Sequence, residues 1–179
     1  FKIIMKSKIF NVSLLLLFIL VTSCTTSGSK SDSSQKSNQV ESSTRLMSYN
    51  IRNAKGLDDV TDYDRIASII NNSAPDIIGV QVDVLNVLAE KTEMFSTYAA
   101  AIDYDGGKYG IGVLSKEKPL SVIRVPLPCS REPRMLLIVE MGEYYFGNTH
   151  FSLNEEDRLI GETNIKEEAK KLKSDEQIY

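Results

Sequence analysis

The chain has 179 residues, with 21 basic and 24 acidic side chains and a formal net charge of −3 at pH 7. Nonspecific affinity for duplex nucleic acid comes mostly from lysine and arginine at phosphates, so this balance argues against tight binding to duplex DNA. The two cysteines, Cys24 and Cys129, are too few for a disulfide framework.

Residues 1–24 have the pattern of an export signal. Three lysines precede an almost unbroken apolar run from Val12 to Val21, which is too short to span a bilayer comfortably. The residues around Cys24 resemble the lipobox of bacterial lipoproteins, in which the cysteine is lipidated and becomes the mature N-terminus. The alternative is a transmembrane anchor with an incidental cysteine. We expect an exported protein that Cys24 attaches to a membrane of the bacterial cell envelope.

Residues 25–44 are rich in Ser, Thr, Lys, Gln and Asn and contain almost no apolar side chains. Such a segment cannot bury enough surface to offset the entropy of ordering it, so we expect a flexible tether. The remaining residues, 45–179, form a segment of about 135 residues, which is long enough for one hydrophobic core.

The domain begins with a strand, a helix and a second strand. Residues 46–51 alternate in polarity, with Met47 and Tyr49 on one face and Asn50 on the other, near the tip of the strand. A helix is expected to begin at Thr61 or Asp62 and end at residues 71–73, and residues 76–82 read as the second strand. Three isoleucines, Ile66, Ile69 and Ile70, form the apolar face of the helix. Parallel strands joined by a crossover helix end side by side, which brings Asn50 close to residues 81–83.

The rest of the domain is expected to consist mostly of strands. A helix over 83–95 precedes strands over 97–103, 109–115, 120–125, 135–140 and 144–150, with turns at 105–107 and 141–143 that favour antiparallel pairing. A charged helix over 155–173 closes the chain, and its thin apolar stripe consists of Leu159, Ile165, Ala169 and Leu172. The sequence therefore predicts an α/β (α+β) fold with mixed sheets.

Five short motifs follow one another in the domain: Leu46–Ile51, Pro75–Gln81, Tyr109–Lys116, Glu132–Arg134 and Asn148–Phe151. In this order they resemble the endonuclease/exonuclease/phosphatase superfamily, in particular its small exported bacterial members. The resemblance implies part of a four-layer α/β/β/α sandwich with largely antiparallel sheets. Because the family's later Gly-Asp-x-Asn motif is absent, we expect a chain truncated before the C-terminal half, with an apolar sheet face left uncovered.

The resemblance also implies a metal-dependent phosphoesterase, in which Mg²⁺ or Mn²⁺ polarises a phosphoryl oxygen. Asn50 matches the family's metal-binding asparagine, His150 matches the histidine that contacts the scissile phosphate, and Arg134 lies in a motif of the small exported members. Each also has a structural interpretation. Asn50 suits a turn, His150 suits an exposed strand end, and Arg134 suits an ion pair with Glu132.

One position departs from the family pattern. Val82 occupies the place of the metal-binding glutamate, and valine cannot ligate a hard cation. Asp83 is the alternative ligand, although strand alternation turns it to the opposite face. We therefore expect a lipid-anchored phosphoesterase with impaired activity and a metal bound weakly if at all. The alternative is a non-catalytic remnant or binding module on a partial fold. The acidic domain favours a small-molecule or lipid-head-group phosphoester over duplex DNA.

Overall fold

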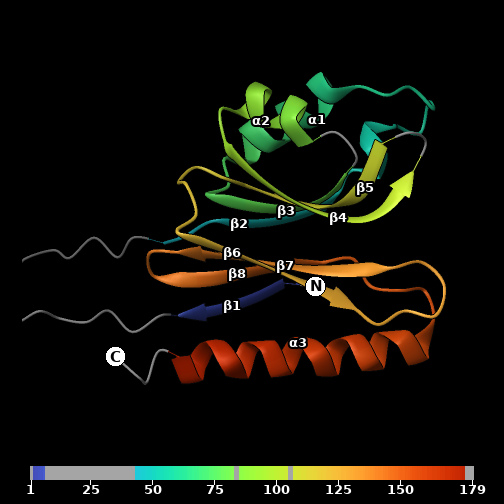
Figure 1. Cartoon of the computed structure of the whole chain (residues 1–179). Helices are drawn as coiled ribbons and strands as arrows, with labels where there is room; N and C mark the ends of the chain where they lie inside the picture. The colour runs from blue at the N-terminus through green and yellow to red at the C-terminus, as the bar shows by residue number, and fades with distance from the viewer. Residues whose placement is uncertain (1, 7–42, 83–84, 105–106, 176–179) are drawn as a thin grey trace, which may run out of the picture. The chain divides into compact units, whose positions relative to one another are not determined.

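The described residues form two four-stranded sheets and three α-helices, as the computed structural model of the chain shows (Figure 1). The structure describes residues 2–6, 43–82, 85–104 and 107–175. One sheet has the strand order β2-β3-β5-β4 and the other has the order β1-β8-β7-β6. The strands are β1 Lys2–Lys6, β2 Leu46–Asn50, β3 Ile77–Val82, β4 Phe95–Tyr104, β5 Gly107–Ser115, β6 Ser121–Leu127, β7 Arg134–Met141 and β8 Tyr144–Thr149, and the helices are α1 Tyr63–Ser73, α2 Leu85–Thr92 and α3 Glu155–Asp175.

The strand-helix-strand unit is confirmed. Strands β2 and β3 pair in parallel, with Asn50 opposite Gln81, and α1 connects them. Helix α1 begins where the sequence indicates, because the side chain of Asp62 accepts a hydrogen bond of 2.9 Å from the backbone N–H of Arg65. The helix ends at Ala74, whose left-handed backbone (φ 46°) reverses the chain toward β3.

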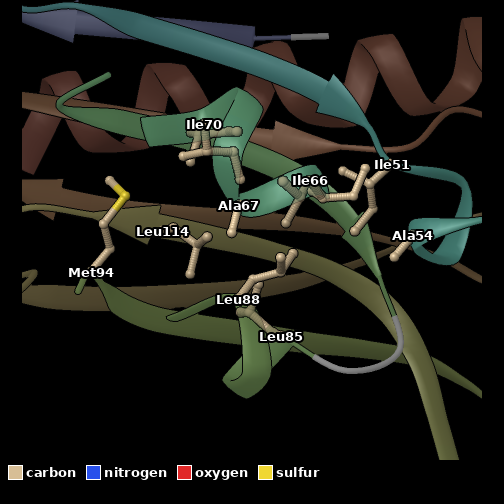
Figure 2. Close-up of a cluster of buried hydrophobic side chains, with 11 residues drawn as sticks. Ile51, Ala54, Ile66, Ala67, Ile70, Leu85, Leu88, Met94 and Leu114 are labelled. Carbon is tan, nitrogen blue, oxygen red and sulfur yellow. The ribbon is translucent and has the colours of Figure 1, made fainter. Parts of the chain in front are cut away.

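Helices α1 and α2 cover the outer face of the first sheet. Ile66, Ala67 and Ile70 of α1 pack with Leu85 and Leu88 of α2 in one buried cluster (Figure 2). The cluster also contains Ile51, Ala54, Ile78, Val80, Met94 and Leu114. This burial joins the crossover helix to the sheet and sets where β2 ends.

The inner faces of the two sheets form a second cluster, which includes Ile77, Val113, Leu137 and Phe146. The long helix α3 packs against the other face of the second sheet, where Ile165 and Leu172 join Leu136 and Ile138 in a third cluster. The layers are therefore helices, sheet, sheet and helix, in agreement with Figure 1. The expected α/β sandwich with mixed sheets is confirmed.

A single buried amide crosses between the sheets. The Nδ2 group of Asn148 on β8 donates hydrogen bonds to the carbonyl oxygens of Val80 (3.2 Å) and Gly112 (2.8 Å) in the facing sheet. Gly79 makes room for it, because a Cβ atom at that position would lie 2.6 Å from Oδ1 of Asn148. The contact ties β8 to both β3 and β5.

Two helix positions differ from the sequence prediction. Ile69 is 40% exposed, because the stripe of α1 that meets the sheet is centred on Ile66 and Ile70. Leu159 is 59% exposed, because α3 turns Gly161 and Ile165 toward the sheet and a residue two places before Gly161 lies on the opposite side. The apolar sheet face that we expected to be uncovered is not found in the described residues, since helices or the other sheet cover it.

The N-terminal region contributes one strand that the sequence did not predict. Lys2–Lys6 pair antiparallel with Tyr144–Asn148 as strand β1, within the segment interpreted as an export signal. The remainder of the expected signal and the tether over 25–44 lie outside the described residues, apart from Ser43 and Thr44. No helix in the described part of the chain is both long and apolar enough to cross a membrane.

Candidate functional site

The candidate site lies where β2, β3 and β8 end. Asn50 is the last residue of β2, Val82 is the last residue of β3, and His150 directly follows Thr149 at the end of β8. The register between β2 and β3 puts Asn50 beside Gln81, which is buried. Two side-chain amides thus occupy neighbouring positions at one edge of the first sheet.

The two sheets bring Asn50 and His150 to the same end of the sandwich. Tyr144, at the start of β8, packs against the buried cluster that contains Ile77, at the start of β3. Further along both strands, Asn148 contacts Val80. Strands β8 and β3 therefore run in the same direction, and His150 follows β8 at the end where Asn50 closes β2.

Asn50 is held by a tight turn. Its Oδ1 atom accepts a hydrogen bond of 3.2 Å from the backbone N–H of Arg52. Arg52, Asn53 and Ala54 then adopt left-handed backbone angles, with φ between 53° and 57°, which non-glycine residues rarely adopt. Ala54 is buried in the cluster of Figure 2, which anchors this turn. This bond between Asn50 and Arg52 uses one of the two lone pairs of Oδ1, so among the described residues the other lone pair and the two N–H donors of Asn50 remain for a ligand.

His150 is the only histidine of the chain and is partly buried. Burial lowers its pKa below the usual 6.5, the positive charge of Arg134 lowers it further, and Glu132 opposes the shift. The imidazole is therefore neutral at pH 7, with one nitrogen that donates and one that accepts. A neutral imidazole at this position can exchange a proton or hydrogen bond with a phosphate ester.

Arg134 forms an ion pair with Glu132, as its structural interpretation from the sequence suggested. Its Nη1 atom lies 2.8 Å from Oε1 of Glu132, and its side chain is only 12% exposed. The Nε atom is buried and has no hydrogen-bond partner among the described residues. Arg134 also lines a hollow of about 350 Å³ beside Ser152 and Asn154. Its charge reaches His150, but Glu132 neutralises part of that charge.

The described donor groups at this site do not fit a divalent metal. Mg²⁺ is bound in proteins through one or two carboxylates, whereas Asn50 and Gln81 offer amide oxygens only. Val82 closes β3 opposite Gly110, and Asp83 lies outside the described residues. Among the described residues, no group of three or more His, Cys, Asp and Glu side chains could hold a metal ion.

Two further groups at the site were not singled out from the sequence. Arg52 lies in the left-handed turn after Asn50, and both residues line an open groove between the loop over residues 52–58 and helix α1. Gln81 lies beside Asn50 and is buried. The strand register could have identified Gln81. Arg52 itself had no signal, since arginine has no preference for left-handed backbone; Asn53, the next residue of the turn, does have one.

The sequence model described as the Endonuclease/Exonuclease/phosphatase family matches residues 47–165, more than half of the chain. Among solved structures, the chain is similar to the mannosyl-6-phosphatase Bt3783 of Bacteroides thetaiotaomicron VPI-5482 (21% identity, TM-score 0.59, covering 73% of this chain and 60% of that one). It is also similar to an endonuclease/exonuclease/phosphatase from Beutenbergia cavernae DSM 12333 (24% identity, TM-score 0.55, covering 66% and 42%). A third similar structure is TDP2 from Caenorhabditis elegans (22% identity, TM-score 0.55, covering 73% of this chain and 42% of that one).

The chain thus spans between 42% and 60% of the length of these structures, and the likeness to them concerns the fold. The comparison with curated proteins gave no match.

The lowered pKa of His150 can be measured directly, because a single histidine gives a single set of imidazole signals in NMR. We expect a pKa below 6.5, raised by Arg134→Gln and lowered by Glu132→Gln. Between pH 6.5 and the pKa of the folded state, the unfolded chain binds more protons, so this group makes stability fall as the pH falls. A pKa at or above 6.5 in the wild-type chain, or no response to either substitution, would contradict the assignment.

Proposed function

The chain belongs to the endonuclease/exonuclease/phosphatase family, and on that premise we propose that it handles a phosphate ester held between Asn50 and His150. The observation that supports this most is the position of these two side chains. They come from separate sheets and lie at the same end of the sandwich, aligned by the contact of Asn148 with Val80 and Gly112. The proposed reaction is hydrolysis of the ester.

The side chains would act on the phosphate in complementary ways. The Asn50 amide donates its N–H groups to phosphate oxygens, while its carbonyl oxygen accepts from the Arg52 N–H and keeps a second lone pair for a cation. The neutral imidazole of His150 donates or accepts a proton at an ester or phosphoryl oxygen. Arg134, partly neutralised by Glu132, adds positive potential near developing negative charge.

We propose that the activity of this chain is low. The chemistry of the family depends on a divalent ion, which polarises the phosphoryl oxygen, and the described donor groups do not fit one. A second candidate function, binding of phosphate esters without turnover, is favoured by the same amide-only donor set.

We propose a small or lipid-borne phosphoester as the substrate. After removal of residues 1–24, which contain three lysines and no acid, 18 basic residues remain against 24 acidic ones. An acidic protein of this kind lacks the cations that bind duplex DNA. One of the similar structures is a mannosyl-6-phosphatase, which is consistent with a small phosphoester.

Substitution of Val82 tests whether β3 ends at a lost metal ligand. In the Val82→Glu variant, a carboxylate joins Asn50 at the ends of paired strands, so added Mg²⁺ should bind the folded state and stabilise it. We expect a stabilisation of about 1.4 to 2.7 kcal/mol when Mg²⁺ is present at ten to a hundred times its Kd. Thermal melts of Val82→Glu and wild type, with and without Mg²⁺, measure it.

The matched control is Asn50→Ala in the Val82→Glu background, where the Mg²⁺ response should shrink. Chelator-sensitive hydrolysis of a chromogenic phosphodiester should also be stronger in Val82→Glu than in wild type, where we expect no turnover above buffer with Mg²⁺. If Val82→Glu destabilises the chain and Mg²⁺ does not relieve it, the register on which the assignment rests is wrong.

We further propose that the mature protein is an exported lipoprotein attached to the membrane through Cys24. The support is the apolar run that ends just before this cysteine. Membrane fractionation of cells that express the wild type or Cys24→Ala tests this proposal. The wild type should sediment with membranes and the variant should not. A soluble wild type, or a variant that stays with the membranes, would rule out the lipid anchor.

A further inference from the structure

An open groove with an apolar wall lies beside Asn50. It has a volume of about 510 Å³ and runs between the loop over residues 52–58 and helix α1. Leu57, Ile66 and Ile69 contribute its apolar surface. A volume of this size is in the range of pockets that hold one small molecule.

Packing within the described protein does not account for the exposure of this wall. Leu57 is 97% exposed, and Ile69 is exposed on the same helix that buries Ile66 and Ile70. Single exposed leucines are common on protein surfaces and carry little information by themselves. Here, however, two large aliphatic side chains line one groove that also reaches Asn50.

The loop that carries Leu57 is held in place. Arg65 of α1 donates from Nη1 to Asp58 (2.9 Å) and from Nη2 to the Val60 carbonyl (3.0 Å), and the Gly56 N–H donates to the same carbonyl (3.0 Å). Ala54, buried among the residues of Figure 2, fixes the start of the loop. The groove therefore exists before any ligand arrives, which lowers the entropic cost of binding.

One cation at the groove, Arg52, has no partner for its side chain among the residues that the structure describes. Arg65 is paired with Asp58 and Lys55 with Asp59, so their charges are largely compensated. The guanidinium of Arg52 makes no ion pair or hydrogen bond to the described residues. Arg52 directly follows the Asn50 strand end, so the unpaired positive charge lies next to the candidate phosphate site.

We propose that this groove binds the apolar alcohol portion of a phosphate ester whose phosphate contacts Arg52 and Asn50. The inference rests on the proposed function and narrows its substrate to phosphate esters of apolar alcohols, bound one molecule at a time. The charge at the Asn50 end matches the phosphate, and the aliphatic wall formed by Leu57 and Ile69 matches the alcohol.

Isothermal titration of the full chain with n-alkyl phosphates tests this inference without any need for turnover. The probes are butyl, hexyl and octyl phosphate, kept below the concentrations at which they aggregate, with glycerol phosphate as the polar control. Affinity should rise about two- to fourfold for each added methylene, because each methylene is removed from water in the groove.

Two variants and a control locate the site. Leu57→Ser should reduce the gain in affinity for each added methylene. The control, Leu120→Ser, alters an exposed leucine outside the groove and should leave that gain unchanged. Arg52→Asn should weaken all the phosphates alike, because it removes the charge and asparagine tolerates the left-handed backbone. Affinity that is independent of chain length, or unchanged by Leu57→Ser, overturns the inference.

The outcomes separate this inference from the proposed function. Alkyl phosphates that bind through Leu57 without any ester being hydrolysed would support the groove and leave binding without turnover as the function. If esters are hydrolysed but the affinity for alkyl phosphates does not depend on their chain length, hydrolysis is supported and the groove inference is contradicted. Binding to phosphate-bearing lipid vesicles, with none to the monomeric alkyl phosphates, would also overturn the inference, since the apolar wall would then contact a membrane instead.

Discussion

The two hydrogen bonds of the Asn148 amide align the halves of this fold. A buried amide group is costly unless its donors are satisfied, and here both donors reach backbone carbonyls of the facing sheet, at Val80 and Gly112. An apolar contact would allow one sheet to slide on the other. In the register where the amide reaches both carbonyls, His150 lies at the same end of the sandwich as Asn50. The absence of a Cβ at Gly79 is part of the same arrangement.

The end of the sandwich that this register creates is well ordered but chemically incomplete. A left-handed turn after Asn50 fixes its amide, and burial keeps His150 neutral. The strand next to Asn50 ends in Val82, so the described residues supply no carboxylate for a divalent ion at this point. Among the described residues, this end of the sandwich therefore holds an amide and an imidazole but no carboxylate beside Asn50.

Much of the fold could be predicted from the sequence because local patterns and packing agree. The alternation of residues 46–51 and the cap at Asp62 are both found in the structure. The exposure of Ile69 could not be predicted, since helical periodicity alone does not say where the sheet meets the helix.

The candidate site was only partly predictable. Family motifs identified Asn50 and His150 as candidates, and the structure brings them to one end of the sandwich. Only Asn53 of the three residues in the left-handed turn favours such backbone angles, so neither the turn nor the charge of Arg52 beside Asn50 was foreseen. The hydrogen bonds of Asn148 join segments that are far apart in the sequence, and local sequence patterns do not predict such contacts.

The most direct test of this account is a double-mutant cycle at the contact between the sheets, with Asn148→Ala and Gly79→Ala measured singly and together by denaturant unfolding. Gly79→Ala should destabilise the wild type, because its Cβ would lie 2.6 Å from Oδ1 of Asn148, and should cost far less once that side chain is removed. We predict a coupling free energy of about 1–2 kcal/mol. Effects that add within about 0.5 kcal/mol would contradict the claim that Asn148 sets the register of the two sheets.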